Sequence, residues 1–386
     1  MASSEFLTRL LAEESVRKYW IIYRGFRANH FAQGAIALHR LGATEEYITG
    51  FKNDYCRSLE PAEAHIQQDA TQASLLTDPY SVIGKEQQYY TLLSHYEDQL
   101  SRVHQNSIAN LISDLFPRIS TGLIADLFHA LIQIGYGRSI GSGQIVCEGM
   151  AWLHYANIPI PLATEELAKH SINDYQEDPF TVLQKVGSDP AVTSLVPPFK
   201  GGAGITRMYR SLIENASEVL LKYAKSVKVP QLSTVPFDAK EVGYDIVDLA
   251  IKVYSASEYR NDFILLHGVT SAWSLSQILP DLKDPKDVLV ACHSYLILLL
   301  GTYVVAGKPN LHIDQLANSD ANNANWSSII EKTLASANWE EHVYKLVQVC
   351  VDMSEERSQN ELLYKSAALS CINFNLRFPG TKNTES

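Results

Sequence analysis

The sequence predicts an all-α protein, a large multi-helix bundle that forms a single domain around a buried central site. Apolar residues recur at three-to-four spacing along almost the whole chain, and the sustained strict alternation of a half-buried strand is hard to find. Glycine- and proline-containing stretches separate these periodic segments. With 386 residues, of which 46% are hydrophobic and 19% charged, the chain has the composition of a globular protein with a substantial core.

The periodic segments follow one another as helix–loop–helix units. "LGAT" separates the second segment from the third, "NIPIP" follows the sixth, and "VPPFKGGAG" precedes the eighth. "LPDLKDP" and "AGKPN" lie on either side of the eleventh. No repeat of 33 to 45 residues emerges, so a solenoid is disfavoured. Helices are therefore predicted near residues 5–24, 26–41, 44–57, 86–114, 120–138, 143–156, 164–171, 205–227, 240–256, 258–278, 285–306, 325–336, 339–354 and 358–373.

Two segments allow more than one interpretation. The strongest interior break is "DPAVTSLVPPFKGGAGI", residues 189–205, which suits a surface connection and, as the alternative, a lid hinge or domain seam. "VLVACHSYLILLLGTYVVAG", residues 288–307, has the roughly 20 apolar residues that a membrane span requires. His293 interrupts this run and no second run of its kind exists, so a buried core helix is the preferred interpretation and no membrane partner is expected.

Charge and cysteine usage exclude several classes of protein. The net charge is −11 and no cluster of Lys and Arg is present, which argues against nucleic acid as a partner. The five cysteines are scattered and none forms a C-x-x-C pair, so neither a disulfide framework nor a thiolate zinc site is indicated. The N-terminal stretch lacks the uninterrupted apolar region of a secretory signal. We therefore expect a reducing, cytoplasmic setting.

Histidines in apolar segments are the chief candidates for a functional site. His30, His129, His267 and His293 each interrupt a strongly apolar helical run, whereas His342 and five others lie in polar or mixed surroundings that suit the surface. An unpaired polar ring in a core costs a few kcal/mol, so each of the four is either a hydrogen-bonded core residue or a ligand. His39 is nine residues from His30, or 900° along a helix, and faces away from it.

Four buried histidines on separate segments predict a convergent metal site, because neutral imidazole is a good ligand for first-row transition metals. Asp126, three residues before His129, is a candidate to orient its ring, and a solvated position is the alternative. Lys365 also interrupts an apolar helix. It can pair with Glu361, reach solvent, or lie buried as a neutral amine that takes up carbon dioxide as a carbamate ligand.

Three strings of the sequence resemble the questin oxidase-like family, a group of oxygenases that includes enzymes opening anthraquinone rings. The strings are "NHFAQGAIALHRLGA", "GLIADLFHALIQIGYG" and "DFILLHGVTSAW", in family order, within a helical background from about residue 20 to about 370. The resemblance implies an N-terminal helical extension over residues 1–19, a questin oxidase-like helical domain over 20–375 and a polar tail over 376–386.

The resemblance also implies a mononuclear non-haem iron, Fe(II), with dioxygen as co-substrate. The family's N-H pair falls on Asn29 and His30, so His30 is the functional histidine of its segment and His39 is not. His129 and His267 match the other two strings, and the remaining ligand roles would fall on His293 and on Lys365 as a carbamylated lysine. Members are also described as NADPH-dependent Baeyer–Villiger oxidases, but no nucleotide-binding fingerprint is present.

Two departures from the family pattern suggest a different substrate. Gln33 and Gln133 stand where many relatives carry histidines, and both are expected to face the pocket. Candidate substrate contacts are Tyr136, Thr270 and Trp273. The predicted function is an oxygenase that opens or inserts oxygen into an aromatic polyketide- or quinone-like substrate. The alternatives are a non-catalytic helical binding or scaffold protein and, less well matched, a zinc hydrolase, because catalytic zinc usually needs three ligands and an activating carboxylate.

Overall fold

The computed structural model describes residues 1–72, 78–197, 199, 204–316, 319–335 and 340–381. Helices make up most of these residues, and their strands form a small antiparallel pair, β1 (Ile22–Tyr23) and β2 (Arg27–Ala28). The predicted all-α fold class is therefore confirmed. The chain divides into two compact units, Met1–Pro159 with Asp281–Lys283, and Ile160–Pro280 with Asp284–Ser386.

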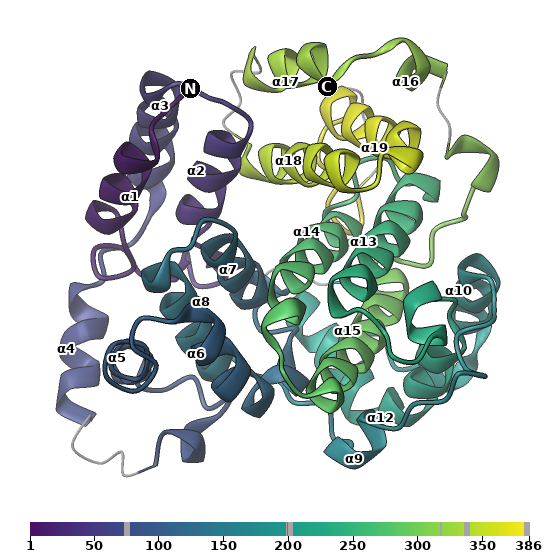
Figure 1. Ribbon diagram of the computed structural model, residues 1–386, viewed down its shortest axis with the longest axis horizontal. Helices are drawn as coiled ribbons and strands as arrows, with labels where there is room; N and C mark the ends of the chain where they lie inside the picture. Colours follow the sequence, from purple (N-terminus) through teal and green to yellow (C-terminus); the bar gives the residue numbers. More distant parts are fainter. Residues whose placement is uncertain (73–77, 198, 200–203, 317–318, 336–339, 382–386) are drawn as a thin grey trace. The chain divides into compact units, whose positions relative to one another are not determined.

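The first unit contains the purple-to-blue helices of Figure 1. Side-chain caps define several of their starts: the Thr44 hydroxyl accepts a hydrogen bond from the Tyr47 amide, and the Ser142 hydroxyl accepts from Ile145. The helices are α1 (Ser4–Glu13), α2 (Phe31–Arg40), α3 (Glu45–Tyr55), α4 (Glu63–Gln72), α5 (Tyr89–Asp98), α6 (Ile108–Leu115), α7 (His129–Ser139) and α8 (Gly143–Tyr155).

The second unit contains the teal-to-yellow helices. Asp238, Asp262 and Asp284 accept hydrogen bonds from the first-turn amides of its three long central helices. The helices are α9 (Thr164–Leu167), α10 (Pro179–Ser188), α11 (Pro190–Thr193), α12 (Gly204–Ser226), α13 (Ala239–Ala256), α14 (Phe263–Ile278), α15 (Pro285–Val305), α16 (Ser319–Asn323), α17 (Trp326–Ala335), α18 (Glu341–Glu356) and α19 (Glu361–Asn373).

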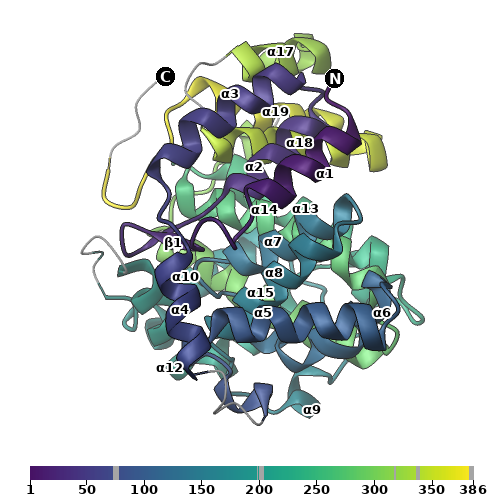
Figure 2. The same ribbon diagram turned by 90° about the vertical axis from the view of Figure 1, so that its left-hand side faces the viewer.

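The core of the first unit is built on α7 and α8, with α5 along the other side of α8 (Figure 2). Glycines let α7 and α8 approach closely. A Cβ on Gly149 would lie 2.6 Å from the Ile134 backbone nitrogen, and one on Gly137 would lie 2.7 Å from the Val146 nitrogen. Such contacts are too short for any side chain, so this approach, on which the position of α7 depends, requires glycine.

The core of the second unit consists of α13, α14 and α15, with α18 and α19 packed on α14 and α13. Among the described residues, α15 is the helix long and apolar enough to cross a membrane, and its most apolar window is completely buried within the protein. This burial is that of a core helix, the interpretation preferred from the sequence for residues 288–307.

Several predicted segments differ from the observed elements: those near residues 26, 164 and 258 are shorter as helices than predicted, and three others are interrupted or begin late. Residues 5–24 contain α1 followed by β1, because the chain leaves the helix at Glu14. Residues 86–114 are divided between α5 and α6 by a π-helical turn, Gln99–Val103. Residues 120–138 become helical only from His129, because three residues before it have left-handed backbone conformations.

The break at residues 189–205 lies partly outside the described residues, which omit 198 and 200–203. Its first part forms the short helix α11. The boundary between the two compact units falls at Pro159 and Ile160 instead, in the "NIPIP" stretch. The predicted polar tail over 376–386 is described only as far as residue 381.

Candidate functional site

In the first unit, two of the four predicted histidines lie together. His30 is the N-cap of α2 and His129 is the first residue of α7. Both are buried, and their ring centroids are 4.3 Å apart with the ring planes at 80°. The structure thus brings together residues 99 positions apart in the sequence, as the prediction of converging histidines requires for this pair.

Asn29, which precedes His30, forms hydrogen bonds that fix the backbone at the start of α2. Its side-chain oxygen accepts a hydrogen bond from the Phe31 amide at 3.0 Å, and its side-chain nitrogen donates to the Trp20 carbonyl at 3.3 Å. The backbone amide of His30 donates to the Tyr55 hydroxyl at 2.8 Å. Asn29 therefore fixes the start of α2, and with it the backbone from which the His30 ring projects.

His129 follows a strained turn. Asp126, Leu127 and Phe128 have φ angles of +46°, +58° and +66°, and none of them is glycine. The left-handed conformation costs roughly 1–2 kcal/mol for each such residue. Strain of this kind persists where the surroundings enforce it, and it concentrates at functional sites. Here the turn delays the start of α7 until His129, and so sets the position of that ring.

The turn also determines which nitrogen of His129 can bind a ligand. The ring Nδ1 is hydrogen-bonded to the backbone carbonyl of Asp126, so it carries the proton and Nε2 carries the lone pair. The Asp126 carboxylate accepts a 2.6 Å hydrogen bond from the Trp152 indole, whose ring stacks on His129 at 6.2 Å and 12°. Desolvation raises the pKa of Asp126 to about 6 against the effect of this bond. Asp126 thus orients His129 through its main chain.

Gln33 and Gln133, the two glutamines expected to face the pocket, are buried and hydrogen-bonded to each other. Gln33 Nε2 lies 3.2 Å from Gln133 Oε1 and 3.4 Å from the His129 carbonyl oxygen. Gln133 Nε2 in turn donates to the Glu148 carboxylate at 3.0 Å. Burial raises the pKa of Glu148 to about 7, and the hydrogen bonds from Gln144 and Gln133 oppose this rise. A chain of polar groups therefore connects α2, α7 and α8.

In the second unit, His267 lies beside a histidine that the sequence analysis had placed at the surface. The ring centroids of His267 and His342 are 5.0 Å apart, and Phe263 packs against both. His267 Nδ1 is 2.7 Å from the Phe263 carbonyl oxygen, so its Nε2 carries the lone pair, as in His129.

His342 is buried, which corrects the expectation of a surface position. Its Nδ1 donates to Glu340 Oε1 at 2.5 Å, and Glu341 Oε1 lies 3.5 Å away. These three residues offer ligand atoms within 4.8 Å of one another. Burial acts to raise the pKa of Glu340, but the attraction and hydrogen bonds of His342 and the attraction of Lys345 lower it. Burial and Glu340 together raise the pKa of Glu341. The surroundings of His342 were missed because "WEEHVY" reads as polar.

Lys345 is a second residue that the sequence analysis overlooked. It lies one turn after His342 on α18 and is completely buried. Burial lowers its pKa to about 8 against the attraction of Glu341 and Glu340. It interrupts the apolar run "VYKLVQVC", the same signal that singled out the four histidines. Lys365, by contrast, makes a 2.9 Å ion pair with Glu361, which is one of the alternatives left open for it.

His293 has hydrogen-bond partners for both ring nitrogens. Its Nδ1 donates to the Leu167 carbonyl at 2.5 Å, and its Nε2 accepts from the Tyr175 hydroxyl at 2.7 Å. Burial lowers its pKa to about 4, so the ring is neutral. These contacts are those of the hydrogen-bonded core histidine that was the alternative to a ligand. The ligand role stays a prediction, and the observed contacts do not support it.

The three predicted substrate contacts are buried. Tyr136 lies on α7, and Thr270 and Trp273 lie on α14. The Thr270 hydroxyl is 3.4 Å from the Leu266 carbonyl of its own helix. Substrate contact stays a prediction for Tyr136, Thr270 and Trp273.

His39 is half-buried and lies near the end of α2 that is far from His30.

Comparison with protein families adds one match. A family model described as questin oxidase-like matches residues 27–350, which is most of the chain and includes all the histidines discussed above. The comparison with curated proteins found no match.

Proposed function

Because the chain belongs to the questin oxidase-like family, we propose that it is a non-haem iron-dependent oxygenase acting on an aromatic polyketide- or quinone-like substrate. Family membership implies an oxidoreductase; the iron, the substrate class and the reaction are our proposal. The observation that carries it is that each unit holds a buried pair of histidines, His30 with His129 and His267 with His342.

The donor set fits a first-row transition metal. His129 and His267 direct Nδ1 at backbone carbonyl oxygens, and His342 directs Nδ1 at a carboxylate. Such partners fix the tautomer and the ring orientation of metal-binding histidines, with Nε2 as the ligand atom. We propose that each histidine pair supplies imidazole ligands to iron.

We propose further that the lysine role implied by the family falls on Lys345 and not on Lys365. A carbamate forms when an uncharged amine takes up carbon dioxide and releases a proton, and it requires a lysine that is kept from full protonation. Complete burial disfavours the charged form of Lys345. Lys365 instead lies 2.9 Å from the Glu361 carboxylate, with which it pairs.

Iron bound by such residues would supply the activation of dioxygen. The protein's own contribution is to orient the imidazoles and to surround them with apolar groups that exclude water. Trp152 covers one face of His129, and Phe263 packs on His267. Tyr136, Thr270 and Trp273 remain our candidates for substrate contacts. The proposed outcome is ring cleavage or Baeyer–Villiger-type oxygen insertion at an aromatic ketone, with NADPH as a candidate reductant.

Metal analysis tests this proposal. The purified protein should contain iron in stoichiometric amounts and consume dioxygen with an aromatic ketone substrate. Replacing His129 or His267 with Ala should lower the iron content sharply. His39→Gln is the matched control, because His39 lies on α2 but outside the pair, and its iron content should equal that of the wild type. Iron contents that are negligible, or the same in all variants, would favour the alternative of a non-catalytic binding protein.

A further inference from the structure

Three buried side chains form a directed chain of hydrogen bonds in the first unit. Gln33 on α2 donates to Gln133 on α7 at 3.2 Å, and Gln133 donates to Glu148 on α8 at 3.0 Å. None of the three is more than 3% exposed. Every donor in the chain points toward the carboxylate.

The ionisation of Glu148 determines this direction. An ionised carboxylate only accepts hydrogen bonds, so Gln133 must turn its amide nitrogen toward it and its oxygen toward Gln33. Gln33 must then present its nitrogen to that oxygen. A protonated carboxyl can also donate, and it permits both amides to turn around. The charge on one residue therefore sets the orientation of two amides on two other helices.

That orientation matters beside the histidine pair. The Gln33 side-chain nitrogen, which donates to Gln133, also lies 3.4 Å from the backbone carbonyl oxygen of His129. If the Gln33 amide reversed, its oxygen would face this carbonyl oxygen and the contact would become repulsive. The direction imposed by ionised Glu148 is thus the one that holds α2, which begins next to His30, against the first residue of α7.

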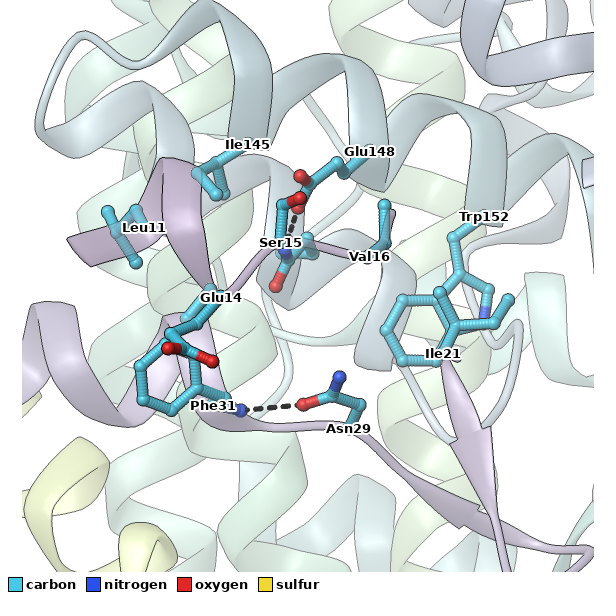
Figure 3. A pocket seen from close by; sticks show the side chains of 12 residues that line it. Leu11, Glu14, Ser15, Val16, Ile21, Asn29, Phe31, Ile145, Glu148 and Trp152 are labelled. Carbon is cyan, nitrogen blue, oxygen red and sulfur yellow. Dashed lines mark hydrogen bonds between the residues drawn. The ribbon is translucent and has the colours of Figure 1, made fainter. Parts of the chain in front are cut away.

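Glu148 lies where its proton can exchange. Its carboxylate lines a small pocket and points toward the Ser15–Val16 segment, with Asn29 and Trp152 on the pocket's other sides (Figure 3). Gln144 Nε2 donates a hydrogen bond to the Glu148 carboxylate at 2.9 Å, and the Val16 backbone donates another. The pocket is lined by Leu11, Glu14, Ser15, Val16, Ile21, Asn29, Phe31, Ala32, Gln133, Ile145, Glu148 and Trp152.

The other ionisable groups around Glu148 are few. Glu14 lines the same pocket and is paired with Lys18 and Lys52. On α5, Glu97 acts to raise the pKa of Glu148, and the Tyr89 hydroxyl donates to its backbone carbonyl. Burial chiefly, with a smaller contribution from Glu97, raises that pKa to about 7 against the hydrogen bonds from Gln144, Gln133 and the Val16 backbone, so the carboxyl changes charge near neutral pH.

We propose that Glu148 is a positioning residue of the His30–His129 site: its ionised carboxylate sets the direction of the Gln133 and Gln33 amides and so holds α2 to the start of α7. The consequence for metal binding rests on the function proposed above, whereas the orientation of the amides does not. Glu148→Gln is neutral at every pH and mimics the protonated carboxyl.

The first test uses the metal-free protein and side-chain amide NMR. In the wild type, the Gln33 and Gln133 amide resonances should move together in one transition near pH 7. In Glu148→Gln the transition should vanish from both amide resonances. In Gln133→Met, in which Glu148 still titrates, it should vanish from the Gln33 resonance. Glu14→Gln, which changes another carboxylate of the same pocket, should keep it. A wild-type Gln33 resonance that does not titrate, or one that titrates equally in Glu148→Gln, would refute the proposal.

The second test uses cobalt(II) as a spectroscopic probe of the histidine site. At pH 8.5 the wild type should bind cobalt about 10-fold more tightly than Glu148→Gln, the size expected for a group that acts through its neighbours on a ligand. The ratio of the two affinities should approach one as the pH falls to 6. Equal affinities at pH 8.5 would overturn the positioning role. If neither protein binds cobalt but the amide transition is seen, the proposed function fails and the role of Glu148 in orienting the amides is supported.

Discussion

Replacing Glu148 with Gln should change how the stability of the metal-free protein depends on pH. The pKa of Glu148 rises from 4.5 to about 7 on folding, chiefly because the carboxyl is desolvated. Below pH 4.5 both folded and unfolded chains are protonated there. Between pH 4.5 and 7 the unfolded chain releases this proton while the folded chain keeps it, so stability is lost across this range; above pH 7 both chains are ionised there and the loss levels off. Since a tenfold change in proton affinity corresponds to about 1.4 kcal/mol, the loss is about 3 kcal/mol.

Glu148→Gln removes this titration, so its free energy of unfolding relative to the wild type should rise by about 3 kcal/mol between pH 5 and pH 8.5. At high pH the variant should be more stable than the wild type by less than these 3 kcal/mol, because its new amide places one N–H against a hydrogen-bond donor, at a cost of about 1–3 kcal/mol. Urea unfolding of both proteins at the two pH values measures the change. Glu214→Gln, at an exposed position on α12, is the control, and its difference in stability from the wild type should depend little on pH. A difference between Glu148→Gln and wild type that is the same at pH 5 and pH 8.5 would refute the reasoning.

Three further outcomes are expected. Lys345→Arg, which cannot form a carbamate, should lose iron and dioxygen consumption, whereas Lys365→Arg should keep both; loss in the second variant alone would restore Lys365 to the site. Tyr175→Phe removes the hydrogen bond to His293 Nε2 and should lower the free energy of unfolding by about 1–3 kcal/mol with no change in iron content. Arg357→Met leaves two buried carboxylates of α13 without their cation and should cost about 3–5 kcal/mol, measured by urea unfolding.

The fold was largely predictable because helices follow local patterns. Periodicity located the long helices α12, α13 and α15 to within two residues. It failed where backbone conformation departs from what the side chains indicate. "TGLIADLFHALIQ" is largely apolar, yet Asp126 to Phe128 are left-handed, and burial of Phe128 together with the Trp152–Asp126 hydrogen bond holds them so. Trp152 lies 26 residues away, beyond the reach of a local pattern.

The site was predictable only in part, for a related reason. A polar residue in an apolar run marks His30, His129 and His267 correctly as buried. The same signal marks Lys345 in "VYKLVQVC". This signal could not identify His342, because its neighbours Glu340 and Glu341 give the segment the polar pattern of a surface position. The burial of His342 depends on Phe263, almost eighty residues earlier.

His293 shows why this signal is not enough to identify a metal ligand. It interrupts a long apolar helix, its Nδ1 donates to a backbone carbonyl as that of His129 and His267 does, and it is as well buried as they are. It differs in its second nitrogen, which accepts a hydrogen bond from Tyr175, a residue 118 positions away. A neutral imidazole has one lone pair available, so Nε2 either accepts this hydrogen bond or binds a metal. Tyr175→Phe separates the two roles, because a structural histidine loses stability when its donor is removed, whereas a histidine that can bind metal gains an available ligand atom. We therefore expect Tyr175→Phe to lower stability and leave the metal content as it was; an increase in bound metal would show that His293 is a latent ligand.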